Sequence, residues 1–403
     1  MCHAPIVVPA VGGDNAARCR ATTRAMREVA ARAVASQPDR MVVISPHSPR
    51  RPNAWGAWIG RHRGDLGEFG APEVAVDLPD APEVGAALGT AGISGKPLDH
   101  GAMVPLSFLW EAGWRGPTAI LALPWGEAGS AAVGQALAAL GGRTAVIASG
   151  DMSHRLKPGA PAGYHPQASA FDAGFVAALT AERWEDALAA AHRDIAAEDV
   201  VDSTAVAMAA AGAPENAEVL SYEGPWGVGY TEAILLDPEP PLYAVARAAI
   251  AAALAGRPYP VPQGGPGPAG TFVTLYKDGA LRGCLGHIEP QHPRLYAEVA
   301  EVAVSSATED PRFSPVRAED LPALTLEISV LEPPELISGP EALDPKVFGV
   351  IVSAGRRRGL LLPDIEGVDT VNHQLAITRR KAGIGPSEPV SLERFRVRKE
   401  APP

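Results

Sequence analysis

Residues 147–155, Ile-Ala-Ser-Gly-Asp-Met-Ser-His-Arg, decide the fold class. An apolar run of strand length leads into a glycine turn, which carries polar residues and reaches a histidine. Two more histidines have a similar setting, because His47 follows the apolar run 41–46 and His3 opens the segment His-Ala-Pro-Ile. Ligands of open α/β sheets gather beyond the carboxyl ends of the strands. We therefore predict an α/β sheet with three histidines at its strand ends.

The first 237 residues alternate between helical and strand patterns. Helices are predicted over 16–36, 83–88, 103–111, 130–140, 168–180, 183–193 and 203–211, and strands over 41–45, 118–123 and 144–149. This order favours a largely parallel sheet with helices on both faces, although a mixed sheet remains open. A hairpin of strands 218–222 and 229–236 is predicted to close this domain.

The domain boundary is predicted at residues 237–241, Asp-Pro-Glu-Pro-Pro. Three prolines in five residues cannot lie inside a helix or a central strand. We therefore expect a first domain over 1–237, a Pro-rich linker over 238–241 and a second domain over 242–403. In the second domain, helices are predicted at 242–254 and 294–307 and strands at 270–277, 324–331 and 349–354, which together indicate an α+β fold.

The composition narrows the function classes. The 403 residues carry a formal net charge of -11, which opposes binding to nucleic-acid phosphates. We find no apolar run long enough for a transmembrane helix and no secretory signal pattern, so we expect neither membrane insertion nor export. Three widely spaced cysteines do not suggest a disulfide framework. The expected location is the cytoplasm, and a homo-oligomer is the expected assembly.

The strand-end histidines suggest a metal site. Two histidines and one carboxylate hold Fe(II) and leave coordination positions open, and His3, His47 and Glu198 can supply this set. In the alternative interpretation, each histidine caps a turn or bonds to a neighbour. Glu198 and Asp199 also precede the predicted helix 203–211, where they can simply interact favourably with the helix dipole.

Two further histidines have an aspartate close by in the sequence. Asp99 precedes His100, and Asp151 lies three residues before His154. An acidic neighbour can orient an imidazole and raise its basicity. Alternatively, both aspartates are helix or turn caps without contact to the rings.

Five segments of the first domain resemble the class III extradiol ring-cleavage dioxygenase superfamily, and most closely its Memo-like branch. They are His-Ala-Pro-Ile-Val-Val-Pro at 3–9, Ser-Pro-His at 45–47, Asp-His-Gly-Ala-Met-Val-Pro-Leu at 99–106, Ser-Gly-Asp-Met-Ser-His-Arg at 149–155 and Tyr-Glu-Gly-Pro-Trp-Gly-Val-Gly-Tyr at 222–230. The second domain resembles the AMMECR1 domain through Leu-Arg-Gly-Cys-Leu-Gly at 281–286, Asp-Pro-Arg-Phe-Ser-Pro at 310–315, Leu-Glu-Ile-Ser-Val-Leu at 326–331 and Lys-Ala-Gly at 381–383. This domain order is similar to the fused AmmeMemoRadiSam system protein A family, which is named for a genomic partnership with a radical-SAM protein.

The resemblance implies a role for each matching residue. His3, His47 and Glu198 would bind Fe(II), with Zn or another divalent metal as the alternative. Asp199 competes for the carboxylate position, because the Memo-like branch often carries a cysteine there. His154 would act as acid and base, and His100 would contact the substrate.

The implied function is a non-haem Fe(II)-dependent extradiol dioxygenase that uses O2 on a catecholic or similarly chelating aromatic substrate. The AMMECR1-like domain would then be an accessory that covers the substrate or docks a partner. The alternative is a non-catalytic metal-binding adaptor that acts with a radical-SAM partner protein. A zinc hydrolase is disfavoured, because we find no additional acidic base motif.

Cys284 is a further candidate in the second domain. It lies in the Arg-Gly-Cys-Leu-Gly turn, where Arg282 could lower the pKa of its thiol. The alternative is a small packing residue next to Gly283 and Leu285.

Overall fold

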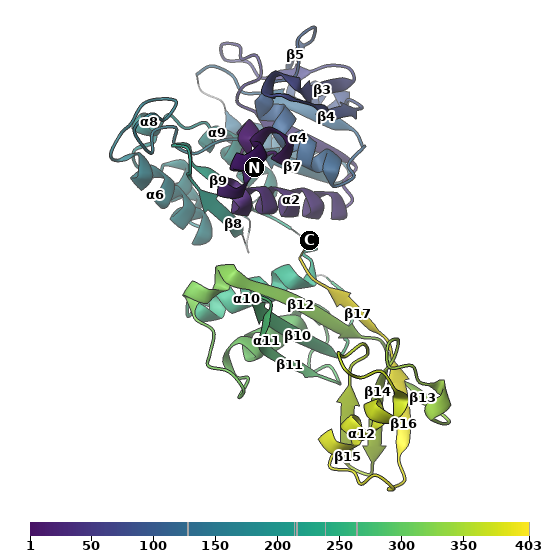
Figure 1. Cartoon of the computed structure of the whole chain (residues 1–403). Coiled ribbons are helices and arrows are strands. Elements are labelled where there is room, and N and C mark those ends of the chain that lie inside the picture. The colour runs from purple at the N-terminus through teal and green to yellow at the C-terminus, as the bar shows by residue number, and fades with distance from the viewer. Residues whose placement is uncertain (127–128, 213, 215–216, 238, 263–264, 403) are drawn as a thin grey trace. The chain divides into compact units, whose positions relative to one another are not determined.

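The chain forms two compact units, Met1–Asp237 and Pro238–Pro403 (Figure 1). The computed structural model describes residues 1–126, 129–212, 214, 217–237, 239–262 and 265–402. Pro238, the first residue of the predicted linker, lies outside the described residues. Each unit is described by itself below.

The first unit is built on a mixed five-stranded sheet with the strand order β5-β2-β6-β1-β7. The central strand β1 (Arg40–Ser45) runs parallel to both β6 (Thr118–Ala122) and β7 (Thr144–Ala148), so the three predicted strands are neighbours. The strand β2 (Gly56–Trp58) runs antiparallel to β6 and parallel to β5 (Ala91–Ile93). The carboxyl ends of β1, β6 and β7 therefore meet at one edge of the sheet.

The sheet is buried on both faces, because β1 sends alternate apolar side chains into two cores. Met41 and Val43 face the core that includes residues of the helices α2 (Arg20–Ala35) and α4 (His100–Glu111). Val42 and Ile44 face the second core, which includes residues of α3 (Pro82–Leu88), α5 (Ser130–Ala138) and α9 (Val201–Ala211). This arrangement confirms the α/β class with helices on both faces.

The first unit also contains two hairpins and further helical segments. The hairpins pair β3 (His62–Leu66) with β4 (Ala71–Leu78) and β8 (Glu218–Glu223) with β9 (Tyr230–Ile234). The 3₁₀ segment Gly13–Cys19 precedes α2, and α6 (Ala168–Thr180), α7 (Trp184–Leu188) and α8 (Arg193–Ala196) follow β7. The prediction of one continuous helix over 183–193 is wrong. The helical conformation is interrupted between α7 and α8, where His192 has a φ of 70°.

The second unit contains two four-stranded sheets. The first has the order β11-β10-β12-β17, formed by β10 (Thr271–Lys277), β11 (Ala280–His287), β12 (Leu324–Leu331) and β17 (Val397–Glu400). The helices α10 (Leu242–Leu254) and α11 (Leu295–Thr308) share a core with it. The second sheet, β13-β16-β14-β15, consists of β13 (Glu335–Ile337), β14 (Gly349–Ala354), β15 (Arg357–Leu361) and β16 (Ser391–Phe395), and α12 (Val371–Lys381) packs on it. The predicted α+β class is confirmed.

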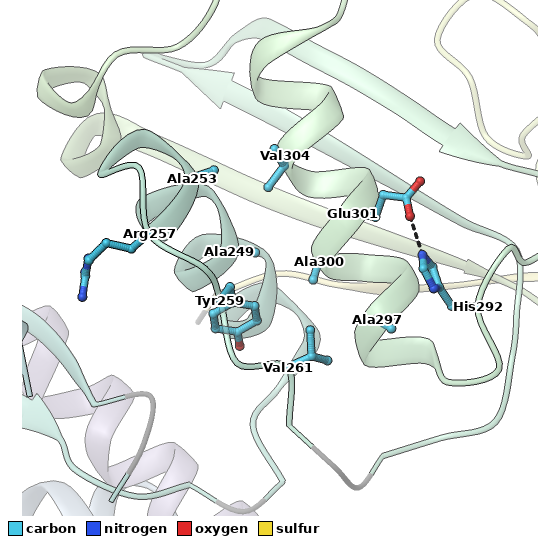
Figure 2. A pocket seen from close by; sticks show the side chains of 10 residues that line it. All are labelled: Ala249, Ala253, Arg257, Tyr259, Val261, His292, Ala297, Ala300, Glu301 and Val304. Carbon is cyan, nitrogen blue, oxygen red and sulfur yellow. Dashed lines mark hydrogen bonds and ion pairs between the residues drawn. The ribbon is translucent and has the colours of Figure 1, made fainter.

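Small side chains leave a cavity of about 310 Å³ in the second unit, between α10 and α11 (Figure 2). The two helices line it with Ala249, Ala253, Ala297, Ala300 and Val304. Tyr259 and Val261, from the segment after α10, form another side, and His292 and Glu301 pair with each other at its margin. Because alanines face each other here, the helices do not fill the space between them.

Across the part of the chain that the structure describes, we find no helix with both the length and the apolar character needed to cross a membrane.

Candidate metal centre

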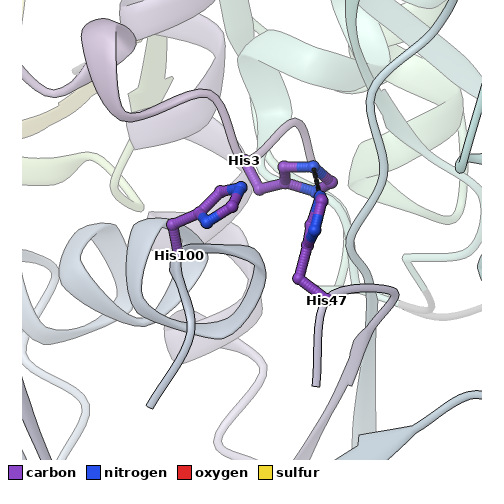
Figure 3. Close-up of side chains that lie close together, drawn as sticks. All are labelled: His3, His47 and His100. Atoms are coloured by element: carbon purple, nitrogen blue, oxygen red, sulfur yellow. Dashed lines mark hydrogen bonds between the residues drawn. The ribbon is translucent and has the colours of Figure 1, made fainter. Parts of the chain in front are cut away.

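Three histidines converge at the carboxyl end of the central sheet (Figure 3). His47 follows β1, His100 opens α4, and His3 lies beside Ser149, which follows β7. One ring nitrogen from each of the three histidines lies within 4.8 Å of the others. The structure thus brings together His3 and His47, and it adds His100, which the sequence assigned to substrate contact.

A carboxylate completes this cluster at distances that suit a bound cation. Oδ2 of Asp199 lies 3.2 Å from Nε2 of His47 and 3.5 Å from Nε2 of His3. The two Nε2 atoms are 3.0 Å apart. Three ligand atoms at about 2.1 Å from one zinc-sized cation would lie about 3.0 Å apart at right angles and about 3.4 Å apart at tetrahedral angles. The three donor atoms therefore have the mutual spacing of ligands to a single ion.

Glu198 does not lie with the histidines, which corrects the predicted position of the carboxylate. Its Oε1 accepts a hydrogen bond from Nε of Arg193 at 2.7 Å, and its Oε2 accepts one from the backbone N–H of Val201 at 2.8 Å. Val201 is the first residue of α9, so Glu198 occupies the helix start, as the dipole interpretation expected. Of the two adjacent acids, the structure places Asp199 at the histidines.

Ser149 determines which nitrogen of His3 carries a proton. The Ser149 hydroxyl donates to the carbonyl of Gly101 at 2.6 Å, and its oxygen lies 3.1 Å from Nδ1 of His3. Because a carbonyl cannot donate, the single hydroxyl proton is used there, and Ser149 Oγ must accept from Nδ1–H. In the neutral ring, Nε2 is then left with its lone pair toward His47 and Asp199, as a metal ligand requires.

Asp151 supports the backbone of this cluster and does not bond to His154. Its Oδ1 accepts from the N–H of His3 at 2.9 Å, and its own N–H donates to Oδ1 of Asp199 at 2.7 Å. Nδ1 of His154 is buried and has no hydrogen-bond partner among the described residues. The expectation that Asp151 orients the His154 ring is therefore corrected, and Asp151 instead orients His3 and Asp199.

Asp99 likewise acts as a cap, the alternative that the sequence left open. One carboxylate oxygen accepts from the N–H of Ala102 at 3.1 Å and caps α4. The hydroxyls of Ser45 and Ser48 each donate to this carboxylate at 2.6 Å. Because these serines flank His47, Asp99 fastens the segment after β1 to the start of α4 and thereby sets His47 beside His100.

Two glycines permit the close approach of these segments. A Cβ atom on Gly101 would lie 2.5 Å from Oγ of Ser45 and 3.2 Å from the His47 ring. A Cβ atom on Gly150 would lie 2.4 Å from Cα of Val200 and 2.9 Å from the carbonyl oxygen of Asp199. Any larger residue at either position would push a ligand segment away.

The electrostatic setting of the cluster favours positive charge. Burial alone would lower the pKa of His3, but the carboxylates of Asp151 and Asp199 raise it to about 9. Burial alone would raise the pKa of Asp199, but His3 and the hydrogen bonds from both histidines hold it well below its usual range. Burial and the rings of His47 and His3 lower the pKa of His100 to about 4, so this ring is neutral at pH 7.

The buried acid Glu232, which contacts the residue before His3, was not predicted from the sequence. Glu232 on β9 is fully buried, and both of its carboxylate oxygens accept from the N–H of Cys2, at 3.1 and 3.3 Å. This contact fixes the residue before His3. No spacing signal pointed to it, because the two partners are 230 residues apart.

Cys284 is half-buried on β11, and contacts within the second unit account for its motif. Its N–H donates to Asp310 at 2.8 Å, and its carbonyl accepts from Arg312 at 2.9 Å, so the segments 281–286 and 310–315 bind each other. Its Sγ lies 3.3 Å from the hydroxyl of Thr274. A Cβ atom on Gly283 would lie 2.2 Å from the carbonyl oxygen of Ser306. These contacts favour the interpretation of Cys284 as a packing residue. The cationic residue that contacts Cys284 is Arg312, whereas the sequence had suggested Arg282 as its cationic neighbour.

A cluster of imidazoles and a carboxylate at the strand ends of an α/β sheet with helices on both faces makes the first unit a candidate metalloprotein. The chain belongs to the LigB family, described as the catalytic LigB subunit of aromatic ring-opening dioxygenase, which matches residues 1–231. The AMMECR1 family matches residues 243–400. Both matches confirm the resemblances found in the sequence.

A relative from Clostridium acetobutylicum is 30% identical over an alignment that covers 98% of this chain and 97% of the relative. A Thermotoga maritima protein is 51% identical over 131 residues, which are 32% of this chain and 75% of that protein. The crystal structure of an uncharacterized protein from Pyrococcus horikoshii is 36% identical, covers 40% of this chain and 91% of that chain, and has a TM-score of 0.37.

Proposed function

We propose that the first unit is a metal-dependent dioxygenase of the extradiol type, with Fe(II) held by His3, His47 and Asp199. The observation that carries the proposal is the triangle of His3 Nε2, His47 Nε2 and Asp199 Oδ2, with edges of 3.0, 3.2 and 3.5 Å. Two imidazoles and one carboxylate on one side of an ion leave its other positions open. This proposal moves the carboxylate ligand from Glu198 to Asp199.

The donor set fits a divalent cation in charge as well as in spacing. Asp199 supplies one negative charge, and the buried acids Asp151 and Glu232 lie behind His3. When bound, Fe(II) supplies the open positions and the redox chemistry that allow a catecholic substrate and O2 to react. Zinc or another divalent metal is the alternative occupant, since the same ligands suit it.

Two further histidines serve the substrate in this proposal. His100 is neutral, and its ring lies 4.2 Å from the His47 ring and 5.9 Å from Phe69. It can therefore donate a hydrogen bond to a substrate oxygen beside an aromatic wall. His154 lies in a segment fixed by backbone hydrogen bonds, and its buried Nδ1 has no hydrogen-bond partner among the residues that the structure describes. This suits a group that accepts and returns a proton.

A non-catalytic metal-binding adaptor is the second candidate, and one observation favours it. The ring nitrogens of His3, His47 and His100 lie within 4.8 Å of one another, so His100 is placed to be a third imidazole ligand, which would help to close the site. A closed site leaves no position for substrate. In this case, the chain would act through a partner, such as a radical-SAM protein.

Anaerobic purification followed by metal analysis and O2 uptake with a panel of catechols tests the proposal. Asp199→Asn should lose the metal, whereas the matched variant Glu198→Gln should retain it. Full metal content in Asp199→Asn, or loss in Glu198→Gln alone, would contradict the ligand assignment. His100→Ala separates the two candidates, because an open site keeps its metal and a closed site loses affinity.

A further inference from the structure

Hydrogen bonds fix the backbone of the segment that carries His154, whereas Nδ1 of the His154 imidazole has no hydrogen-bond partner among the described residues. The backbone N–H of Met152 donates to Gly229 at 2.9 Å, that of Ser153 to Asp172 at 2.9 Å and that of His154 to Ala196 at 3.0 Å. The imidazole contributes nothing to this framework through Nδ1, which is buried without a partner among the described residues. A ring held this firmly by its backbone, yet unbonded at Nδ1, is available for chemistry.

Asp172 on α6 is the one acid in this framework, and it is fully buried. Its Oδ1 accepts from Ser153, and its Oδ2 accepts from the hydroxyl of Tyr222 at 2.8 Å. Gly229 makes room for it, because a Cβ atom there would lie 2.1 Å from Oδ2. Three separate segments thus accommodate this carboxylate.

The hydrogen bonds alone do not explain why this residue is an acid. An asparagine could accept from Ser153 with its carbonyl and donate to the oxygen of Tyr222 with its amide, without the cost of burying a charge. Asp172 has no Lys, Arg or His partner within 4.0 Å in the described part of the chain. Neither the two hydrogen bonds nor a salt bridge within the described residues therefore accounts for an acid at this position, whose carboxylate bonds to the residue next to His154.

We propose that Asp172 is a positioning residue for His154, which fixes its segment through Ser153 and provides the counter-charge for its imidazolium form. Tyr222 holds the carboxylate in place. The importance of this charge for turnover rests on the proposed function, in which His154 returns a proton to the substrate. The electrostatic coupling itself does not rest on that function.

The charges around His154 agree with this role. Burial raises the pKa of Asp172 to about 6, and the donors Ser153 and Tyr222 together with His154 oppose that rise, so the carboxyl is mostly ionised at pH 7.5. Burial raises the pKa of Asp151, and the ring of His154 is among the groups that oppose this rise. Arg155, Lys157 and His165 are titratable groups on the flanking segments, and the backbone N–H of His165 donates to the carbonyl of Arg155 at 3.1 Å.

The test is the pKa of the His154 imidazole, measured by NMR in the full chain loaded with Zn(II), with His154→Gln to assign the signal. Asp172→Asn should lower this pKa by roughly 0.5 to 1 unit, because the counter-charge is gone. The matched control is Glu223→Gln, which removes a carboxylate on β8 that bonds to Thr22 at 2.6 Å. This control should leave the His154 pKa unchanged.

An unchanged His154 pKa in folded Asp172→Asn would overturn the proposal, whatever the change in melting temperature. If that variant does not fold, Tyr222→Phe replaces it, because loss of the hydroxyl makes Asp172 harder to ionise and should lower the His154 pKa by a smaller amount. No shift in Tyr222→Phe would then overturn the proposal. None of these measurements needs turnover, so failure of every catechol to support O2 uptake would reject the proposed function and leave this result standing.

Discussion

Ser149→Ala tests how the structure prepares His3 for a metal. The change removes the oxygen that accepts from Nδ1 of His3 at 3.1 Å and the proton that Gly101 accepts at 2.6 Å. Two buried groups then lose their partner, at roughly 1–3 kcal/mol each. The His3 ring also loses the contact that fixes its tautomer, and loss of such a contact typically weakens metal binding by roughly 10- to 100-fold.

The assay is competition between the protein and a chelator for Zn(II), with the melting temperature measured on the same preparation. Ser107→Ala is the matched control. Ser107 is also buried in the first unit, and among the described residues its hydroxyl bonds within α4, to the carbonyl of Val104 at 2.7 Å. We expect both variants to lose stability and only Ser149→Ala to lose metal affinity. Equal Kd values for the two variants would refute the tautomer argument.

Three other outcomes are expected. Burial raises the pKa of Asp172 from 3.8 to about 6, so the folded protein loses stability as this carboxyl ionises. As the pH rises from about 4 to above 6, the free energy of unfolding of the wild type should therefore fall by up to roughly 3 kcal/mol relative to that of Asp172→Asn. Denaturant titrations across this pH range measure the difference, and parallel stability curves for the two proteins would exclude it. Limited proteolysis should cut first within 237–241 and release two folded fragments, whereas unfolded fragments 1–237 and 242–403 would show that the units depend on each other. Gly283→Ala, whose Cβ would lie 2.2 Å from a backbone oxygen, should lower the unfolding temperature of the second unit and leave metal binding by the first unchanged, as calorimetry with metal analysis can establish.

The elements that the sequence predicted well are those with long apolar patterns. The strand 41–45 was readable because both of its faces are buried, which gives a continuous apolar run. The strands β2 and β5 have three residues each, which is too short for any period to emerge. The helix predicted over 183–193 failed because a periodic pattern does not reveal a residue with positive φ such as His192.

The site was partly readable for a related reason. The strand-end motifs indicated His3 and His47 as candidate ligands. The choice between Glu198 and Asp199, however, depends on the local backbone conformation, which decides where each of these two adjacent side chains points. Local sequence carries no information on that direction, and Arg193 attracts one of the two. Asp172 had no signal at all, because its partners lie 19 and 50 residues away.

The long sequence separation within the cluster has a consequence for folding. His3 meets His47 across 44 residues and Asp151 across 148 residues, so the unfolded chain offers no preformed ligand set. A cation that binds only the folded unit stabilises it by mass action, about 2.7 kcal/mol at a free concentration of 100 times Kd. Closing such long loops is also slow. Under the proposed function, the first unit should therefore acquire a metal late in folding, and a shortage of that metal in the cell would leave the unit in its less stable, metal-free form.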